Sequence, residues 1–474
     1  MSADPATAPI LAGLAAGAVP LLPGWALSGL LPRAIRRALV ARLGAAWLLG
    51  AAWCGATALA ASRLGGLPLR RGVLLPLVLV PLAAALVLGR RRLALDRPAR
   101  PAPVSAVAGA IGGLTCAVLL AHALSTPVTG WDGLMTWVPQ VRLMRAERTA
   151  TPAAFRDPWV WVTHPQYPPL VSLVQVTGLE IVDAPVDERA GRVVFPLFFA
   201  AFLALLHRTA RLLTRSARAA AVAAALAAMT PFLAFSDHGG AKGAYADVPL
   251  AAFLGGALAV LLCGGLRSGA GLAGGLLLAG AVLTKTEGIP LASGLSVLLL
   301  LVAVAGLRRR PRAVRRARAL RMLRSALAAA VLLGASIALL HAWRAEIPNR
   351  YTEDYGAILA ATRLEAREIG SKLATVAPSL AAGLFDVTKW GLLWPLLVTL
   401  SMVRPGALRR RAALAAGGLV LGPVAIALAA YAVHWNPISL ADVSWDRFLV
   451  QGAFGTFLLL GLVAAPQTEA PRAS

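Results

Sequence analysis

The chain is a succession of long apolar runs separated by short clusters of arginine. Each run spans about 17 to 25 residues, which is the length that an α-helix needs to cross the hydrocarbon of a membrane. About thirteen such runs fit between residues 9 and 465. Hydrophobic residues make up 58% of the 474 residues and charged residues only 14%. Because soluble proteins carry roughly a quarter charged residues, the sequence predicts an all-α, polytopic membrane protein.

The arginine clusters predict which helix ends face the cytoplasm. Cytoplasmic links carry an excess of Lys and Arg, so the formal net charge of +25 indicates topology and contact with anionic lipid rather than a nucleic-acid partner. The densest cluster has nine Arg between residues 308 and 324. Counting runs from these clusters places the N-terminus outside a cell membrane and the tail, residues 466–474, in the cytoplasm. Because successive spans cross the membrane in alternating directions, the links rich in acidic and aromatic residues are all expected on the extracytoplasmic face.

Asp132 is an isolated carboxylate in the stretch TGWDGLMTWVPQVRLM, where it directly follows the fourth apolar run. The segment from Thr126 to Arg189 has no long apolar run but is rich in Trp, Pro and Tyr. It is expected to form a structured extracytoplasmic loop with short helices on the membrane surface, one of them from Leu134 to Arg148. Asp132 is then either a solvated residue beside an aromatic belt or a catalytic carboxylate that meets substrates at the membrane surface.

The outer links carry further candidate residues besides Asp132, and most of these also have a structural interpretation. Asp247 precedes a Val-Pro pair, where a carboxylate commonly stabilises a helix start. Lys285 and Glu287 are two residues apart and would not pair on a helix; they are expected at a helix end instead. Indoles such as that of Trp131 usually anchor a protein at the membrane interface. The remaining candidates are Tyr167, His164, His238, Lys242 and Arg447.

A metal site is not predicted. His164 and His238 are far apart in the sequence and lack a recognisable metal-ligand spacing, although either could orient Asp132. The cysteines, Cys54, Cys116 and Cys263, all lie inside apolar runs, so they are expected to be buried free thiols without disulfides.

The order and sidedness of five segments resemble the GT-C superfamily of integral-membrane glycosyltransferases. The segments are TGWDGLMTWVPQVRLM, HPQYPPL, GAYADVPLAAF, LTKTEG and SWDRFLVQ. They are most similar to bacterial relatives of the protein O-mannosyltransferases and aminoarabinose transferases, glycosyltransferase family 39. The resemblance covers roughly residues 104–465 and implies a catalytic module there, with residues 1–103 as an N-terminal transmembrane extension. Many members carry a second acidic residue directly after the first-loop Asp, whereas this chain has Gly133, which leaves use of a divalent metal open.

The resemblance implies transfer of a sugar, with inversion, from a polyprenyl-phosphate donor to a lipid, glycan or protein acceptor on the extracytoplasmic face. An inverting transfer needs one base to take the acceptor proton, and Asp132 is the expected base. Fixed cations can stabilise the charge of the departing lipid phosphate, and Lys285, Lys242 and Arg447 are expected in that role. Further substrate contacts are expected from Asp247, Glu287, Tyr167, His164, His238 and Trp131. No cofactor is expected.

Two other classes of membrane protein compete with a transferase. A polytopic transporter usually shows an internal repeat and polar residues near the middle of its spans, and the sequence shows neither. A scaffold or lipid-handling protein without catalysis explains the apolar runs but not the concentration of Asp, His, Lys and Trp on one face. The sequence therefore favours the transferase, without identifying its sugar, polyprenyl length or acceptor.

Overall fold

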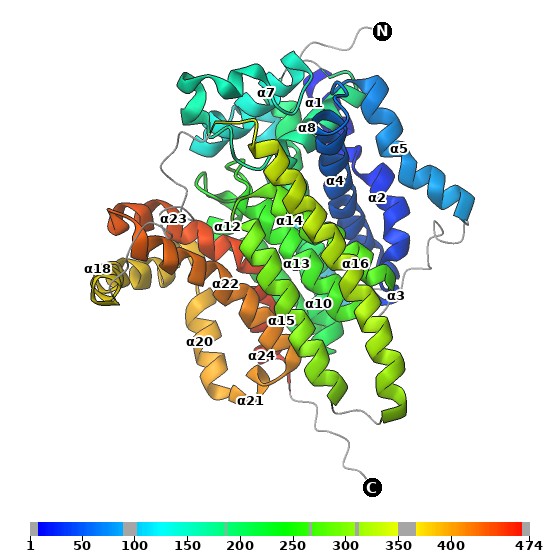
Figure 1. The fold of residues 1–474 in the computed structure, drawn as a ribbon. Coiled ribbons are helices and arrows are strands. Elements are labelled where there is room, and N and C mark those ends of the chain that lie inside the picture. The colour runs from blue at the N-terminus through cyan, green and yellow to red at the C-terminus, as the bar shows by residue number, and fades with distance from the viewer. Residues whose placement is uncertain are drawn as a thin grey trace.

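The computed structural model describes residues 8–88, 102–184, 187–264, 268–308, 312–348 and 366–466, and within these ranges every regular element is a helix (Figure 1). Eight segments are long and apolar enough to cross a membrane, and a bent pair of helices makes a ninth candidate. The predicted all-α, multi-pass architecture is therefore confirmed, whereas the predicted count of thirteen spans is not.

The eight candidate spans coincide with predicted apolar runs. They are formed by α1 (Ala8–Ala18) with α2 (Leu21–Leu27) and η1 (Ser28–Leu30), α4 (Leu39–Arg63), α6 (Pro103–Ser125), α9 (Glu188–Arg192) with α10 (Val194–Thr214), α13 (Asp247–Gly264), α15 (Gly288–Arg308), α16 (Arg312–Arg344) and α22 (Arg411–Val433). The bent pair is α23 (Pro437–Gln451) and α24 (Ala453–Ala464), which meet at an angle of 56°.

The other four predicted runs form shorter helices. They are α5 (Arg71–Leu88), α11 (Ala217–Met229), α14 (Ser268–Thr284) and α20 (Leu393–Val403). Two interruptions have a local cause. Thr230 adopts an extended conformation before Pro231, because proline disfavours a helical residue in front of it. Gly391 has a φ of 56°, so α19 (Val387–Trp390) ends there and α20 begins as a separate helix.

The segment between α6 and α9 is helical but lies only partly on the surface. The predicted helix from Leu134 to Arg148 appears as η3 (Gly133–Trp137), a π-helical turn, followed by α7 (Val138–Glu147). Two 3-10 turns follow, η4 (Ala153–Arg156) and η5 (Pro158–Thr163), and then α8 (Leu170–Ile181). All side chains of α8 from Leu170 to Leu179 are buried, and the helix packs against α4. This part of the expected surface loop therefore belongs to the core.

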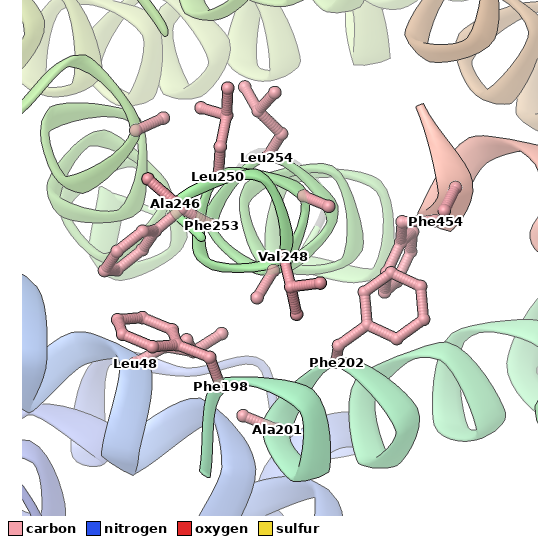
Figure 2. Close-up of a cluster of buried hydrophobic side chains, with 14 of the residues drawn as sticks. Leu48, Phe198, Ala201, Phe202, Ala246, Val248, Leu250, Phe253, Leu254 and Phe454 are labelled. Atoms are coloured by element: carbon pink, nitrogen blue, oxygen red, sulfur yellow. The ribbon is translucent and has the colours of Figure 1, made fainter. Parts of the chain in front are cut away.

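The central helix of the bundle is α13. Its side chains from Asp247 to Val260 are all buried, as expected of a helix that is apolar on every side. Phe198 and Phe202 of α10 face it together with Leu48 of α4 (Figure 2), and the rings of Phe198 and Phe253 lie 5.3 Å apart. Gly255 leaves room for the Phe454 ring of α24, which a side chain at position 255 would meet. The core therefore fixes α13 between α4, α10 and α24.

Among the described residues, the arginine-rich end of α10 and the arginine-rich starts of α16 and α22 gather at one end of the bundle, here called the arginine end, which lies towards the bottom of Figure 1. There Arg208, near the end of α10, donates a 2.8 Å hydrogen bond to the carbonyl of Ala34 in α3 (Arg33–Arg36). Arg404, just before α21 (Pro405–Leu408), donates to the carbonyl of Ala465 at 3.0 Å. The starts of α16 and α22 lie at the same end, whereas α7 and the start of α13 lie towards the other.

Part of the predicted topology falls outside the described residues. This applies to residues 89–101, which hold the arginine cluster after the third run, to residues 265–267 with Arg267, to residues 309–311 of the densest arginine cluster, to residues 349–365 of the link after α16 and to residues 467–474 of the tail.

The arrangement predicts that the two ends lie on opposite sides of the membrane. In a variant whose three cysteines are replaced by Ala, a cysteine at Trp159, which is 85% exposed in η5, should react with a membrane-impermeant maleimide in intact cells. A cysteine at Arg218, an exposed residue at the arginine end, should react only after permeabilisation. Labelling of both positions from one side would contradict the topology.

Candidate functional site

Five charged side chains from four separate segments meet near the start of α13, away from the arginine end. We call Asp132, Asp247, Lys285, Glu287 and Arg447 the charge network. Asp247, the first residue of α13, is completely buried. Its Oδ1 lies 2.6 Å from Lys285 Nζ, and its Oδ2 lies 3.1 Å from Arg447 Nε. A buried carboxylate is costly unless it is paired, and these two cations provide the pairing.

Arg447 joins the two aspartates. Its Nη2 lies 2.6 Å from Asp132 Oδ2, while its Nε bonds to Asp247. The planar guanidinium presents donors in several fixed directions, which suits a bridge between carboxylates from different segments. Gln451, one turn later on α23, donates to Asp247 Oδ1 at 2.9 Å. The ring of Tyr245 lies 4.8 Å from the Arg447 guanidinium carbon.

Lys285 and Glu287 form an ion pair at the helix end where the sequence placed them. Lys285 Nζ lies 3.2 Å from Glu287 Oε1, although residues two apart do not face each other within a helix. The two residues lie in the turn between α14 and α15 rather than within a helix, so the helical spacing rule does not apply. Lys285 therefore lies between two carboxylates.

Two glycines allow the segment around Asp132 to pack against the loop before α13. A side chain at Gly130 would meet the carbonyl of Gly243. A Cβ at Gly133 would lie 2.5 Å from Val128 Cγ1 and 3.2 Å from the Gly243 oxygen. A side chain at position 133 would therefore have to displace Val128 and crowd the Gly243 carbonyl. Asp132 itself precedes the π turn η3, and π turns are frequent at functional sites.

The backbone near the network contains two residues in a conformation that favours glycine. Ala244 has a φ of 59° and His164 a φ of 46°. Such conformations cost free energy, and they cluster at functional sites, where surrounding contacts maintain them. Ala244 precedes Tyr245, and His164 stacks on Tyr167 with 4.8 Å between the ring centres.

The aromatic side chains next to the network contain polar groups in unusual environments. Burial raises the pKa of the Tyr245 phenol, and the nearby Asp132 carboxylate raises it further, so the phenol stays neutral. Tyr167 lies within electrostatic range of Arg447, and its ring centre is 6.3 Å from that of Trp137. The Trp137 indole nitrogen and the Thr136 hydroxyl are buried without a hydrogen-bond partner among the described residues. Such groups are rare in proteins.

Five of the predicted site residues lie outside the charge network: Tyr167 and His164, which stack on each other, and Lys242, His238 and Trp131. Lys242 pairs with Asp237 at 3.1 Å, so it does not join Lys285 and Arg447. The His238 ring centre lies 6.5 Å from that of Tyr245, and Trp131 is 56% exposed. Over the described ranges, no group of three or more His, Cys, Asp or Glu side chains is placed to hold a metal ion.

Sequence reasoning missed Gln451 and Tyr245. A signal was present for both. Gln451 follows Arg447 by four residues, which places the two side chains on one helix face, and Tyr245 stands two residues before Asp247 in GAYAD.

No family profile, curated protein or solved structure matches this chain. The resemblance to the GT-C superfamily therefore stays a prediction from the sequence, and so does the division of the chain at residue 103. The chemistry of the site has to be inferred from its geometry.

The network predicts a large structural role for Asp247. Asp247→Ala removes the shared partner of Lys285, Arg447 and Gln451, and breaking a buried ion pair costs about 3 to 5 kcal/mol. The variant should unfold at a clearly lower temperature in detergent. As a control, Glu368→Ala removes an exposed carboxylate that pairs with Lys372 one turn away, a pair worth about 0.5 kcal/mol. Equal melting temperatures of the two variants would contradict the role of Asp247.

Proposed function

We propose that the protein is a membrane glycosyltransferase that moves a sugar from a polyprenyl-phosphate donor to an acceptor on the extracytoplasmic face, with inversion and with Asp132 as the general base. The observation that carries the proposal is the charge network itself, which joins Asp132 to Arg447 and, through Asp247, to Lys285. A carboxylate beside two cations is the set of groups that this chemistry needs: a base for the acceptor and positive charge for the leaving phosphate.

The burial of the aspartates supports different roles for them. The Asp247 side chain is 0% exposed, whereas those of Asp132 and Arg447 are 11% and 19% exposed. A substrate can therefore reach Asp132 and Arg447 but not Asp247, which acts as a positioning residue. Asp132 uses Oδ2 for Arg447, and its Oδ1 accepts no hydrogen bond from the described residues. That oxygen is available to take a proton.

The cations retain hydrogen-bond donors for a phosphate. Arg447 has five N–H groups, and its two contacts with carboxylates engage Nε and one hydrogen of Nη2. Lys285 has three N–H groups and contacts two carboxylates. Both cations can therefore bind the donor phosphate without leaving Asp247.

The proposed reaction is a single displacement. Asp132 Oδ1 removes the proton of an acceptor hydroxyl while the hydroxyl oxygen attacks the anomeric carbon from the face opposite the phosphate. The bond between that carbon and the phosphate oxygen breaks, and its electron pair stays on the oxygen. Polyprenyl phosphate leaves with its negative charge stabilised by Arg447 and Lys285, and the transferred sugar has the inverted configuration.

A polytopic transporter is the second candidate function. A fully buried carboxylate that pairs with cations inside a spanning segment is also typical of ion and proton pathways, and Asp247 has this environment.

The two functions differ in their product, because only a transferase releases polyprenyl phosphate. The wild-type protein should therefore be purified and offered a panel of polyprenyl-phosphate-linked hexoses and pentoses with membrane-extract acceptors. Release of polyprenyl phosphate supports the transferase, whereas solute flux in vesicles without any release supports the transporter.

Asp132→Asn should abolish most of the transfer activity. The substitution keeps the size of the side chain but removes the base, so turnover should fall by roughly 10² to 10⁴. Asp187→Asn is a matched control, because Asp187 pairs with Arg189 at 2.6 Å and caps α9, a role that Asn also fulfils. That control should keep normal turnover.

Thermal stability separates catalysis from structure at Asp132. Asparagine can still accept a hydrogen bond from Arg447, so most of the variant should remain folded. If the loss of turnover only follows a loss of folded protein, Asp132 is a structural ion-pair partner. A folded Asp132→Asn protein with near-normal turnover would exclude Asp132 as the base.

Arg447→Gln and Lys285→Gln should weaken use of the donor. Truncating one partner of a buried charge pair typically costs about 2 to 5 kcal/mol, which would appear mainly as a higher KM for the polyprenyl-phosphate sugar. Lys372→Gln removes a cation that pairs with Glu368 on α18 (Ala366–Leu384) and should leave the KM unchanged. An unchanged donor KM in both network variants would remove these cations from the site.

A further inference from the structure

A cavity lies between α18, α19 and α23, and no residue of the charge network lines it. Its volume is about 430 Å³, within the range of roughly 300 to 1,000 Å³ that is usual for small-ligand sites. Asp446, which lines the cavity, directly precedes Arg447 on α23. Successive residues of a helix point about 100° apart, so α23 presents one side chain to the cavity and the next to the network. The polar residues of the lining are Ser379, Asp386, Lys389, Asp442 and Asp446.

The lining has an excess of negative charge. Asp446 lies 2.7 Å from Lys389 Nζ and also accepts a hydrogen bond from the Trp390 indole at 3.2 Å. Asp386 lies 3.9 Å from the same Lys389 nitrogen. Asp442 has no ion-pair or hydrogen-bond partner among the described residues. One ammonium therefore faces three carboxylates, and the cavity favours a ligand that carries a positive charge.

Large apolar side chains are exposed next to the residues that line the cavity. Phe385 and Val387, which are 49% and 57% exposed, flank Asp386, and Val443, 65% exposed, follows Asp442. Trp435 is 84% exposed just before α23. Exposed apolar surface of this kind marks contact with a membrane or a partner, and α18 and α23 lie at the edge of the bundle (Figure 1). The cavity therefore adjoins a surface suited to lipid acyl chains.

The geometry points to a binding site for the head group of an ammonium-bearing phospholipid, of the phosphatidylethanolamine type. The ammonium bonds to the carboxylates of Asp442 and Asp446, and the remaining N–H group of Lys389 donates to the phosphate. The acyl chains lie on the apolar side chains beside Asp386 and Asp442. An anionic lipid without an amine would meet the excess of carboxylates, and a soluble amine would make no use of the apolar surface. The site is independent of the proposed transferase activity.

Lipid binding to the purified full-length protein tests the site. Native mass spectrometry in detergent should show phosphatidylethanolamine bound at least about tenfold more tightly than phosphatidylglycerol with the same acyl chains, a difference of about 1.4 kcal/mol. Asp442→Lys should remove this preference. Glu368→Lys makes the same charge change on α18 at an exposed residue outside the cavity lining and should keep the preference.

A second variant guards against an indirect effect of charge. Ala382 is exposed and lines the cavity, so Ala382→Phe fills the cavity without crowding the core and should also lower phosphatidylethanolamine binding about tenfold. Melting temperatures confirm that each variant is folded. Equal binding of the two lipids by the wild type, or unchanged binding in both cavity variants, would overturn the proposal. Soluble phosphoethanolamine that binds as tightly as the lipid would overturn the assignment to a membrane lipid.

Discussion

The structure depends on how the buried carboxylate of Asp247 is neutralised. α13 is apolar and buried on all sides, and its first residue is a carboxylate that no water reaches. An unpaired ion in such a place costs several kcal/mol, so the fold has to place partner groups beside the carboxylate. The contact with Lys285 anchors the turn between α14 and α15 to Asp247, and the contacts with Arg447 and Gln451 anchor α23. Asp132 is then held through Arg447, so one buried charge positions four segments of the chain.

Much of the fold was predictable because hydropathy and arginine clustering are local properties of the sequence. The all-α class, the long spans and the gathering of arginine at one end all follow from composition along the chain. The burial of α8 was not predictable in the same way. Its apolar stretch has only 12 residues, too few for a span, and its burial depends on packing against α4. The short helices α11 and α20 show that one proline or one glycine suffices to divide an apolar run.

The candidate site was predictable as a set of residues but not as a set of contacts. Asp132, Asp247, Lys285 and Arg447 were identified as polar residues on one face, whereas their pairing joins positions 38 to 315 residues apart. Only the packing of the helices decides such distances. For the same reason Lys242, a cation in an equally suitable link, pairs with Asp237 instead. Lys285 and Glu287 pair because the chain turns at the helix end where the sequence placed them, so the helical spacing rule does not describe their contact.

The break between α23 and α24 has a mechanical consequence. Phe454 at the start of α24 occupies the space next to Gly255, so α24 packs so closely against the central helix that even one methyl group at position 255 would clash. α23 lies on the other side of the 56° bend at Gly452. Asp446 and Arg447 are neighbours on α23, so a change in the tilt of this one helix would displace the cavity lining and the charge network together.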